Sequence, residues 1–264
     1  AEPLPNPIGT APGWFVRLDG RIIVAMPGVP REMTRMWREQ VVPRLTGLLP
    51  NRSVRSITLR TVGIGESAVE QLLDDLVKSA NPVVATYAKD DGVHVRITAI
   101  ASAPVEAEAM RDRVVQEVRR RLARHIYGTD DVTLPAALLD LLRKHGLTLA
   151  IADRAAGGRF ASLLLSDPSS RDVLLESTAA GPAETTALDL ARMARDRSGA
   201  GVGLGILMDA RPDGPVWEGT VHIGVAGSPE IEEHFPMRSA YDEIQRRSAL
   251  MAADVLRRWL LDRP

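Results

Sequence analysis

The segment from 152 to 158 has the residue types and spacing best suited to chemistry. It reads Ala-Asp-Arg-Ala-Ala-Gly-Gly and lies between a strand-like apolar run (147–152) and a helix-like apolar run (160–165). A tight turn with paired glycines at such a junction is where an acyl-transfer enzyme places a nucleophile and an oxyanion hole. The residues after the aspartate carry no hydroxyl, thiol or ionisable base, so the sequence predicts a turn that lacks its reactive groups. This degenerate site comprises Asp153, Arg154, Ala155, Ala156, Gly157 and Gly158.

A second set of candidates lies in the Pro-rich N-terminal region. Residues 27–30 form a Pro-Gly turn before a helical run, and such a turn presents free N–H groups that suit a phosphate. The alternative is an ordinary strand-to-helix turn, with proline at the first helical position and a glutamate that favours the helix dipole. Both interpretations stay open. The candidate ligand-binding residues are Asn6, Gly9, Thr10, Pro27, Gly28, Pro30 and Glu32.

Histidines, arginines and further glycines give weaker signals. The histidines at 94, 125, 145, 222 and 234 show no paired helical spacing and no cysteine accompanies them, so we expect no metal site built on them. The arginines between 111 and 124 alternate with acidic residues, which is typical of a solvated helix face. Gly63 and Gly65 precede a helix and suggest an anion nest, but the GXXG loop needed for RNA is missing there. We therefore expect no nucleic-acid partner.

The composition excludes several classes of protein. The 264 residues are 45% hydrophobic and 25% charged, as in an ordinary globular chain. A net charge of −1 gives no long-range attraction to nucleic acid or anionic membranes, and 4% aromatic residues argue against base-stacking surfaces. No cysteine is present, which removes disulfides and thiolate catalysis. Without a recognisable membrane span or signal peptide, we expect a cytoplasmic location and no membrane partner.

The order of elements predicts an α/β chain in three segments, 1–50, 51–128 and 129–264. The first has a hairpin turn at Asp19-Gly20 followed by a helix, which buries too little surface to be stable alone. The second reads as β-α-β-β-α. The third alternates helices with strands at 147–152, 202–208 and 216–225, which is typical of a layered α/β domain.

Five motifs in order give a resemblance to a known family. They occupy residues 6–13, 27–33, 62–67, 126–128 and 147–158. In this order they resemble the competence/damage-inducible protein CinA family over nearly the whole chain. The resemblance implies a partial molybdopterin-binding-like α/β segment in an N-terminally truncated first domain (1–50). It also implies a small KH-like α+β domain (51–128) and a layered α/β CinA C-terminal domain of the amidohydrolase type (129–264).

The resemblance also implies activities, and two departures from the family pattern argue against them. In the family, the first domain is associated with ADP-ribose pyrophosphatase activity and the last domain with deamidation of nicotinamide mononucleotide. The family's amidohydrolase motif is Ala-Glu-Ser-Cys-Thr-Gly-Gly with a presumed serine nucleophile, and Arg154 stands at the serine position. A guanidinium cannot attack an amide carbon. The family's Gly-rich phosphate-binding stretch has no counterpart here, so no cofactor is evident and a divalent metal is expected only with a missing N-terminal part.

From these departures we expect an inactive amidohydrolase-like domain that acts as a structural, oligomerising or nucleotide-sensing module. A nucleotide ligand and a homo-oligomer are the expected partners. Arg154 allows two interpretations, because it could bind a phosphate or carboxylate, or it could face solvent beside an abandoned pocket. Asp153 and Asp209 are expected at the carboxyl ends of strands, as bases or as helix caps.

The alternative is an active nucleotide hydrolase with a displaced nucleophile. Such an enzyme would need a hydroxyl within hydrogen-bond reach of a base beside Gly157. The hydroxyl-bearing candidates are Ser162, Ser166, Ser169, Ser170 and Thr178.

Overall fold

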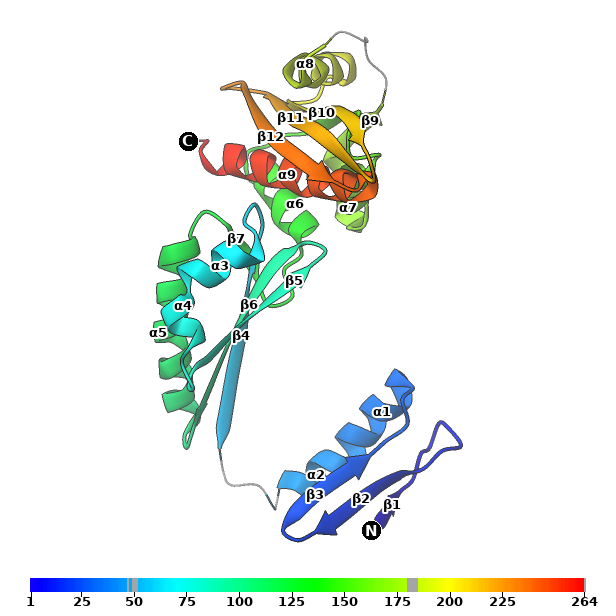
Figure 1. Cartoon of the computed structure of the whole chain (residues 1–264), viewed down its shortest axis with the longest axis vertical. Helices are drawn as coiled ribbons and strands as arrows, with labels where there is room; N and C mark the ends of the chain where they lie inside the picture. Colours follow the sequence, from blue (N-terminus) through cyan, green and yellow to red (C-terminus); the bar gives the residue numbers. More distant parts are fainter. Residues whose placement is uncertain (47, 49–51, 180–184, 264) are drawn as a thin grey trace. The chain divides into compact units, whose positions relative to one another are not determined.

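The computed structural model describes residues 1–46, 48, 52–179 and 185–263. They form two compact units, one of Ala1–Ser53 with Ala101–Pro104 and the other of Val54–Ile100 with Val105–Pro264 (Figure 1). The expected mixed α/β class is confirmed. The middle and last predicted segments share one unit, and the predicted boundary at 50/51 lies outside the described residues, so the three-domain division stays a prediction.

The first unit is a three-stranded antiparallel sheet, in the order β1-β2-β3, with a helical segment. The predicted hairpin turn is confirmed, because Asp19 and Gly20 have φ angles of 49° and 73°. Met36 is buried, whereas Met33 and Trp37 are exposed, and a π-helical turn begins at Trp37. The elements are β1 (Glu2–Leu4), β2 (Gly13–Leu18), β3 (Arg21–Ala25), α1 (Pro30–Met36), η1 (Trp37–Val41) and α2 (Val42–Thr46).

The second unit begins with a four-stranded sheet in the order β5-β6-β4-β7. Helices α3 and α5 contribute Val69, Val118 and Leu122 to one apolar core with the strands, and Leu73, which follows α3, joins them. The strand β7 was not predicted, because four residues are too few to show a period. The elements are β4 (Ser53–Thr61), α3 (Glu66–Leu72), α4 (Asp74–Val77), β5 (Val83–Lys89), β6 (Gly92–Ala101), α5 (Pro104–Leu122) and β7 (Ile126–Thr129).

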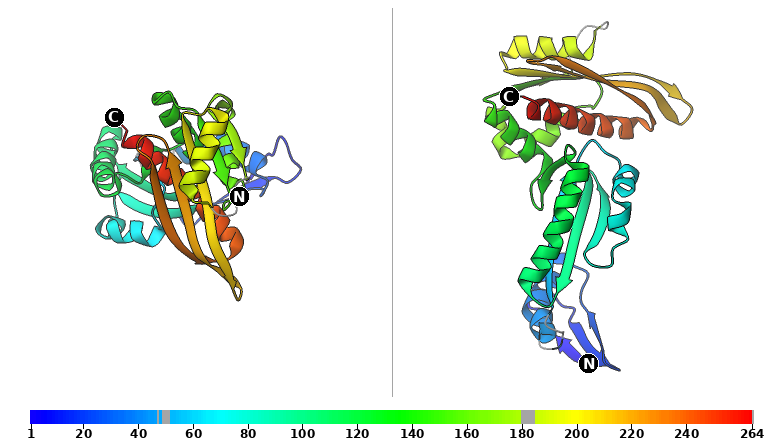
Figure 2. Two further views of the ribbon diagram at one scale, coloured as in Figure 1. Left: turned by 90° about the horizontal axis from the view of Figure 1, so that it is seen from above. Right: turned by 90° about the vertical axis from the view of Figure 1, so that its left-hand side faces the viewer.

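A five-stranded sheet follows, in the order β12-β11-β10-β8-β9. β8 is parallel to β9 and β10, while β10, β11 and β12 are antiparallel. Figures 1 and 2 show α8 on one face of this sheet and α6, α7 and α9 on the other. The elements are α6 (Leu134–Lys144), β8 (Leu149–Asp153), α7 (Arg159–Leu165), η2 (Pro168–Asp172), β9 (Leu174–Thr178), α8 (Ala187–Ser198), β10 (Val202–Asp213), β11 (Val216–Ala226), β12 (Ile231–Ser239) and α9 (Tyr241–Leu261).

Helix α8 lies unusually close to this sheet because glycines line the contact. A Cβ at Gly203 would overlap the carbonyl oxygen of Ala191, and one at Gly205 would overlap that of Ala187. Close backbone packing therefore accounts for the alternating glycines of β10.

The strand β10 is longer than predicted. It runs to Asp213 and pairs with β11 without interruption, so Asp209 is an exposed residue within the strand. The prediction that Asp209 lies near the carboxyl end of a strand is wrong, because the hairpin of β10 and β11 continues beyond the core to Asp213.

Candidate functional site

The strand β8 ends at Asp153, the first residue of the predicted degenerate turn. All five residues of β8 are buried, and Asp153 ends the strand with 4% of its surface exposed. Its Oδ1 accepts hydrogen bonds from the backbone nitrogens of Ala155 (3.0 Å) and Ala156 (2.6 Å). Its Oδ2 accepts one from the nitrogen of Gly158 at 2.7 Å. Asp153 therefore caps the turn, which is one of its two predicted roles.

These hydrogen bonds close the turn to an incoming oxyanion. An oxyanion hole needs backbone N–H groups that point at developing negative charge. Here three such groups already donate to a buried carboxylate. A second anion at the same place would meet that negative charge at close range.

The two glycines serve the shape of the turn itself. Gly157 and Gly158 have φ angles of 62° and 78°, a left-handed conformation that side-chain-bearing residues rarely adopt. A Cβ at Gly157 would lie 2.6 Å from Nε2 of Gln245 in α9. Their presence therefore follows from backbone geometry and packing and needs no catalytic role.

Arg154, Ala155 and Ala156 stand where the family motif has Ser-Cys-Thr, and their side chains offer no nucleophile. Ala155 and Ala156 are 2% and 0% exposed and belong to the apolar core of the domain. Arg154 is half-buried, and its backbone nitrogen donates to the carbonyl of Ile206 at 2.7 Å. Its backbone is thus fixed against β10.

The hydroxyls proposed as displaced nucleophiles have other partners or none. Ser166 Oγ donates to the carbonyl of Leu163, and Ser169 Oγ donates to Asp167, each at 2.7 Å. The hydrogen bond from Ser169 lowers the pKa of Asp167, which makes that carboxylate a poorer base. Ser162 is exposed, Thr178 is half-buried at the end of β9, and the Ser170 hydroxyl is buried without a partner in the described part of the chain. None of the contacts described for Ser166 and Ser169 joins a hydroxyl to a base beside Gly157.

In the first unit, three of the candidate ligand-binding residues come together. Asn6 Nδ2 donates to Glu32 at 2.6 Å, and a Cβ at Gly9 would overlap both side chains. Pro30 occupies the start of α1, as predicted. Thr10, Gly28 and Pro30 are exposed and Pro27 is half-buried, and the binding role of the whole set stays a prediction.

A cavity of about 610 Å³ in the second unit was not predicted. It is lined by residues from the segment that holds the four-stranded sheet and by residues of α9. These segments are far apart in the sequence, so no local motif predicts the cavity. Its apolar lining includes Phe235, Leu250 and Met251. Its charged lining consists of Glu66, Lys89, Arg124, Arg246, Arg247, Asp254 and Arg258.

Positive charge prevails in this cavity. Arg258 is paired with Glu233 and Asp254, and Arg246 with Glu243, whose pKa it lowers. Within the described ranges, neither Lys89 nor Arg247 forms an ion pair. The cavity thus keeps the cationic side chains of Lys89 and Arg247, and the carboxylate of Glu66, beside apolar ones.

The two histidines at 222 and 234 lie side by side, which their spacing along the chain did not predict. They lie opposite each other on β11 and β12, with Glu232 beside them. A helical period does not reveal such a pair, because it forms across two strands.

None of the helices in the described ranges has the length and apolar character needed to cross a bilayer.

Comparison with known proteins gives the family. The family model for the damage-inducible protein CinA KH domain matches residues 56–128. A CinA-like protein of Thermomicrobium roseum is 45% identical and covers 99% of this chain, which spans 67% of that protein. This chain belongs to the CinA family. A CinA-like protein of Dictyoglomus thermophilum is 32% identical, with 98% of this chain and 69% of that protein covered.

The chain of this CinA-family protein matches only part of its relatives. It spans 55% of a CinA-like protein of Deinococcus deserti, with 42% identity over 78% of this chain. The solved competence damage-inducible protein A of Klebsiella pneumoniae is 12% identical, covers 50% of this chain and 97% of its own, and has a TM-score of 0.44. A structural likeness of that size carries no argument about function.

Proposed function

We propose that the C-terminal part of this CinA-family chain does not hydrolyse nicotinamide mononucleotide and acts as a structural and ligand-binding module. The observation that carries the proposal is the Asp153 carboxylate, which accepts the N–H groups of Ala155, Ala156 and Gly158. The guanidinium of Arg154 at the serine position supports it, because it offers no attacking group.

The turn around Asp153 lacks free oxyanion-hole donors as well as a nucleophile, because its N–H groups donate to the Asp153 carboxylate. Loss of one oxyanion-hole donor costs an enzyme about 2.7–4 kcal/mol in transition-state stabilisation. A water molecule or a displaced hydroxyl that attacked the amide here would find these donors already bound to an anion. Restoring the nucleophile alone should therefore not restore turnover.

The experiment is ammonia release from nicotinamide mononucleotide by the purified full chain. We expect a rate equal to that of the uncatalysed reaction, both for the chain and for the variant R154S/A155C/A156T, which carries the family's Ser-Cys-Thr. Turnover by the unmodified chain that disappears in S162A, S166A, S169A, S170A or T178A would contradict the proposal and support a displaced nucleophile.

We propose further that the cavity beside α9 binds a phosphate-bearing nucleotide. Its volume of about 610 Å³ lies within the range of about 300–1,000 Å³ found for small-molecule sites. Apolar side chains such as Phe235 and Met251 suit a base or ribose, and the unpaired charges of Lys89 and Arg247 suit a phosphate.

Calorimetric titration with nicotinamide mononucleotide and with ADP-ribose tests this binding. We expect the variants K89A and R247A each to weaken binding about tenfold, since a charge-assisted hydrogen bond contributes roughly 1.5–3 kcal/mol. R113A is the control, because Arg113 is an exposed arginine outside the cavity. No binding, or equal affinity in all three variants, would contradict the nucleotide site.

The remaining expectations also stay proposals. A homo-oligomer would show in light scattering as a mass above that of one chain. The role of Asn6, Gly9 and Glu32 in a pocket of the first unit, and a cytoplasmic location, need separate tests.

A further inference from the structure

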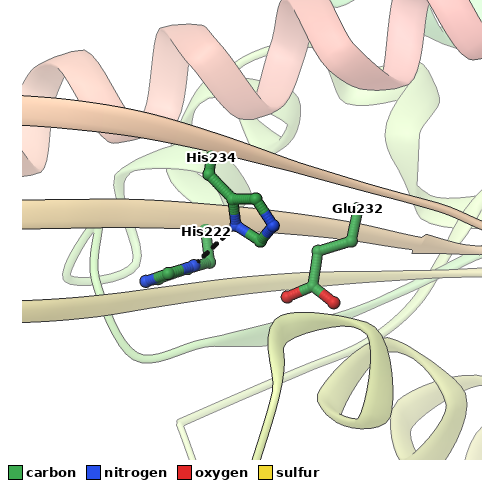
Figure 3. A group of neighbouring side chains, drawn as sticks. All are labelled: His222, Glu232 and His234. Carbon is green, nitrogen blue, oxygen red and sulfur yellow. Dashed lines mark hydrogen bonds between the residues drawn. The ribbon is translucent and has the colours of Figure 1, made fainter.

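The antiparallel pairing of β11 and β12 places three metal-ligating side chains on one face of the sheet. His222 and His234 are directly opposed in the register, and Glu232 is two residues before His234 on the same strand. Because side chains two positions apart share a face, Glu232 and His234 project to the same side. Gly224, which opposes Glu232, carries no side chain, and the start of α8 packs against it, since a Cβ there would lie 2.4 Å from the backbone nitrogen of Leu188. Figure 3 shows the three side chains converging.

The ligand atoms are close enough for one ion. An imidazole nitrogen of each histidine and an oxygen of Glu232 all lie within 4.8 Å of one another, and the part of the chain that the structure describes holds no second group of this kind. The two Nδ1 atoms are 2.7 Å apart. Tetrahedral zinc with Zn–N bonds of about 2.0–2.1 Å needs roughly 3.3 Å between two nitrogens, so a small rotation of the exposed His234 is enough.

The carboxylate is already oriented toward the histidines' side of the sheet. Glu232 Oε1 accepts a hydrogen bond at 3.2 Å from the backbone nitrogen of Ala187, the first residue of α8. A hydrogen bond that fixes a ligating carboxylate is a usual feature of metal sites. The second carboxylate oxygen remains available to an ion.

The chemistry of the donors selects the type of ion. Two imidazoles favour zinc, copper, nickel or iron over magnesium and calcium, which prefer oxygen ligands alone. Two histidines and one glutamate leave the fourth tetrahedral position for water or an added ligand. A pair of imidazoles joined only by a hydrogen bond is the alternative, with Glu232 serving only the backbone nitrogen of Ala187, and the metal titration distinguishes the two.

We propose that His222, Glu232 and His234 form a binding site for a divalent transition-metal ion of the zinc type. The bound ion joins β12, an edge strand of the five-stranded sheet, to β11. Through Glu232 it also fixes the start of α8. The site lies on other residues than the Asp153 turn, so it stands independently of the proposed loss of hydrolysis.

The test is a metal titration of the full chain without a histidine tag, after treatment with EDTA. We expect one equivalent of Co²⁺ to give the visible absorption bands of a tetrahedral site and Zn²⁺ to displace it. H222Q and H234Q should each weaken binding by at least about tenfold, since even loss of an outer partner of a metal ligand costs about 10–100-fold. H145Q removes a histidine outside the cluster and should bind as the unmodified chain does.

A second measurement decides the question if a variant fails to fold. Imidazole nitrogen NMR of the unmodified chain should show two histidine rings shifting together on addition of Zn²⁺, in a 1:1 titration. Binding of less than one equivalent, equal loss in H145Q, or no change of two rings together would overturn the proposal.

Discussion

The Asp153 carboxylate and the backbone nitrogen of Ala156 are 2.6 Å apart, and this hydrogen bond is one of three by which the carboxylate binds its own turn. The turn therefore keeps the backbone shape expected at a strand-to-helix junction while its N–H groups serve the fold. In the proposed function, the stability of the turn and the lack of hydrolysis have the same cause, since the carboxylate that satisfies these amides also excludes an oxyanion.

Replacement of Asp153 by alanine should lower the free energy of unfolding by about 3 kcal/mol, because hydrogen bonds to a charged group contribute roughly 1.5–3 kcal/mol and three amides, two of them buried, lose their acceptor. Chemical denaturation followed by circular dichroism measures the change. D140A is the control, since the side chain of Asp140 is 81% exposed. A stability equal to that of D140A would show that the three hydrogen bonds contribute nothing.

Replacement of Gly205 by alanine should destabilise the second unit by about 1–3 kcal/mol, the usual cost of overpacking. The added methyl group overlaps the carbonyl oxygen of Ala187, so α8 must move away from the sheet. G65A is the matched control, because a Cβ at Gly65 meets no atom within 4 Å. Thermal unfolding of both variants makes the comparison, and an unchanged midpoint for G205A would contradict the close contact of α8.

Replacement of Asp254 by alanine should cost about 3–5 kcal/mol, as expected when one partner of a buried ion pair is lost. Asp254 lies 2.8 Å from Arg257, whose side chain is 2% exposed, and it also pairs with Arg258. The control D262A breaks the exposed pair of Asp262 with Arg124 and should cost no more than about 1 kcal/mol. Similar losses in the two variants would argue against a buried charge at Arg257.

The pH dependence of stability should reveal Asp91. Burial raises the pKa of this carboxyl, but the hydrogen bond from Tyr127 and the charges of His94 and Arg60 outweigh burial, so the pKa lies below its ordinary value of 3.8. A carboxyl with a depressed folded pKa stabilises the fold above its unfolded pKa, and this stabilisation is lost as pH falls through the folded pKa.

The variant D91N should therefore be less stable than the unmodified chain at pH 7, by about 1 kcal/mol, and this difference should shrink below a pH of about 4. Denaturant titrations at a series of pH values measure it. D90N, at the exposed neighbouring residue, should show no such dependence. A difference that stays constant down to pH 2 would contradict the depressed pKa.

The sequence predicted the elements whose signals are local. The hairpin turn at Asp19-Gly20 and the strand-to-helix junction at Asp153 were found because positive-φ residues and apolar periods are visible within a few positions. The strand β12 and the helix α8 were not predicted. β12 reads Ile-Glu-Glu-His-Phe-Pro-Met-Arg-Ser and has too weak an alternation to stand out.

The sequence predicted the strand-to-helix turn at Asp153, and the role of this turn as a degenerate site stays a prediction. The missing nucleophile could be read from Arg154, whereas the hydrogen bonds of Asp153 depend on a turn geometry that residue types do not give. The cavity beside α9 and the pairing of His222 with His234 depend on contacts between distant segments, and no local pattern records those.

The most direct test of the proposal that the Asp153 turn supports no hydrolysis is the rate of amide hydrolysis of nicotinamide mononucleotide. This rate is measured as ammonia released with and without the full chain. Equal rates are expected, because the Asp153 carboxylate holds the donors that the transition state needs. A rate above background that is lost when a single hydroxyl among Ser162, Ser166, Ser169, Ser170 and Thr178 is replaced by alanine would contradict it.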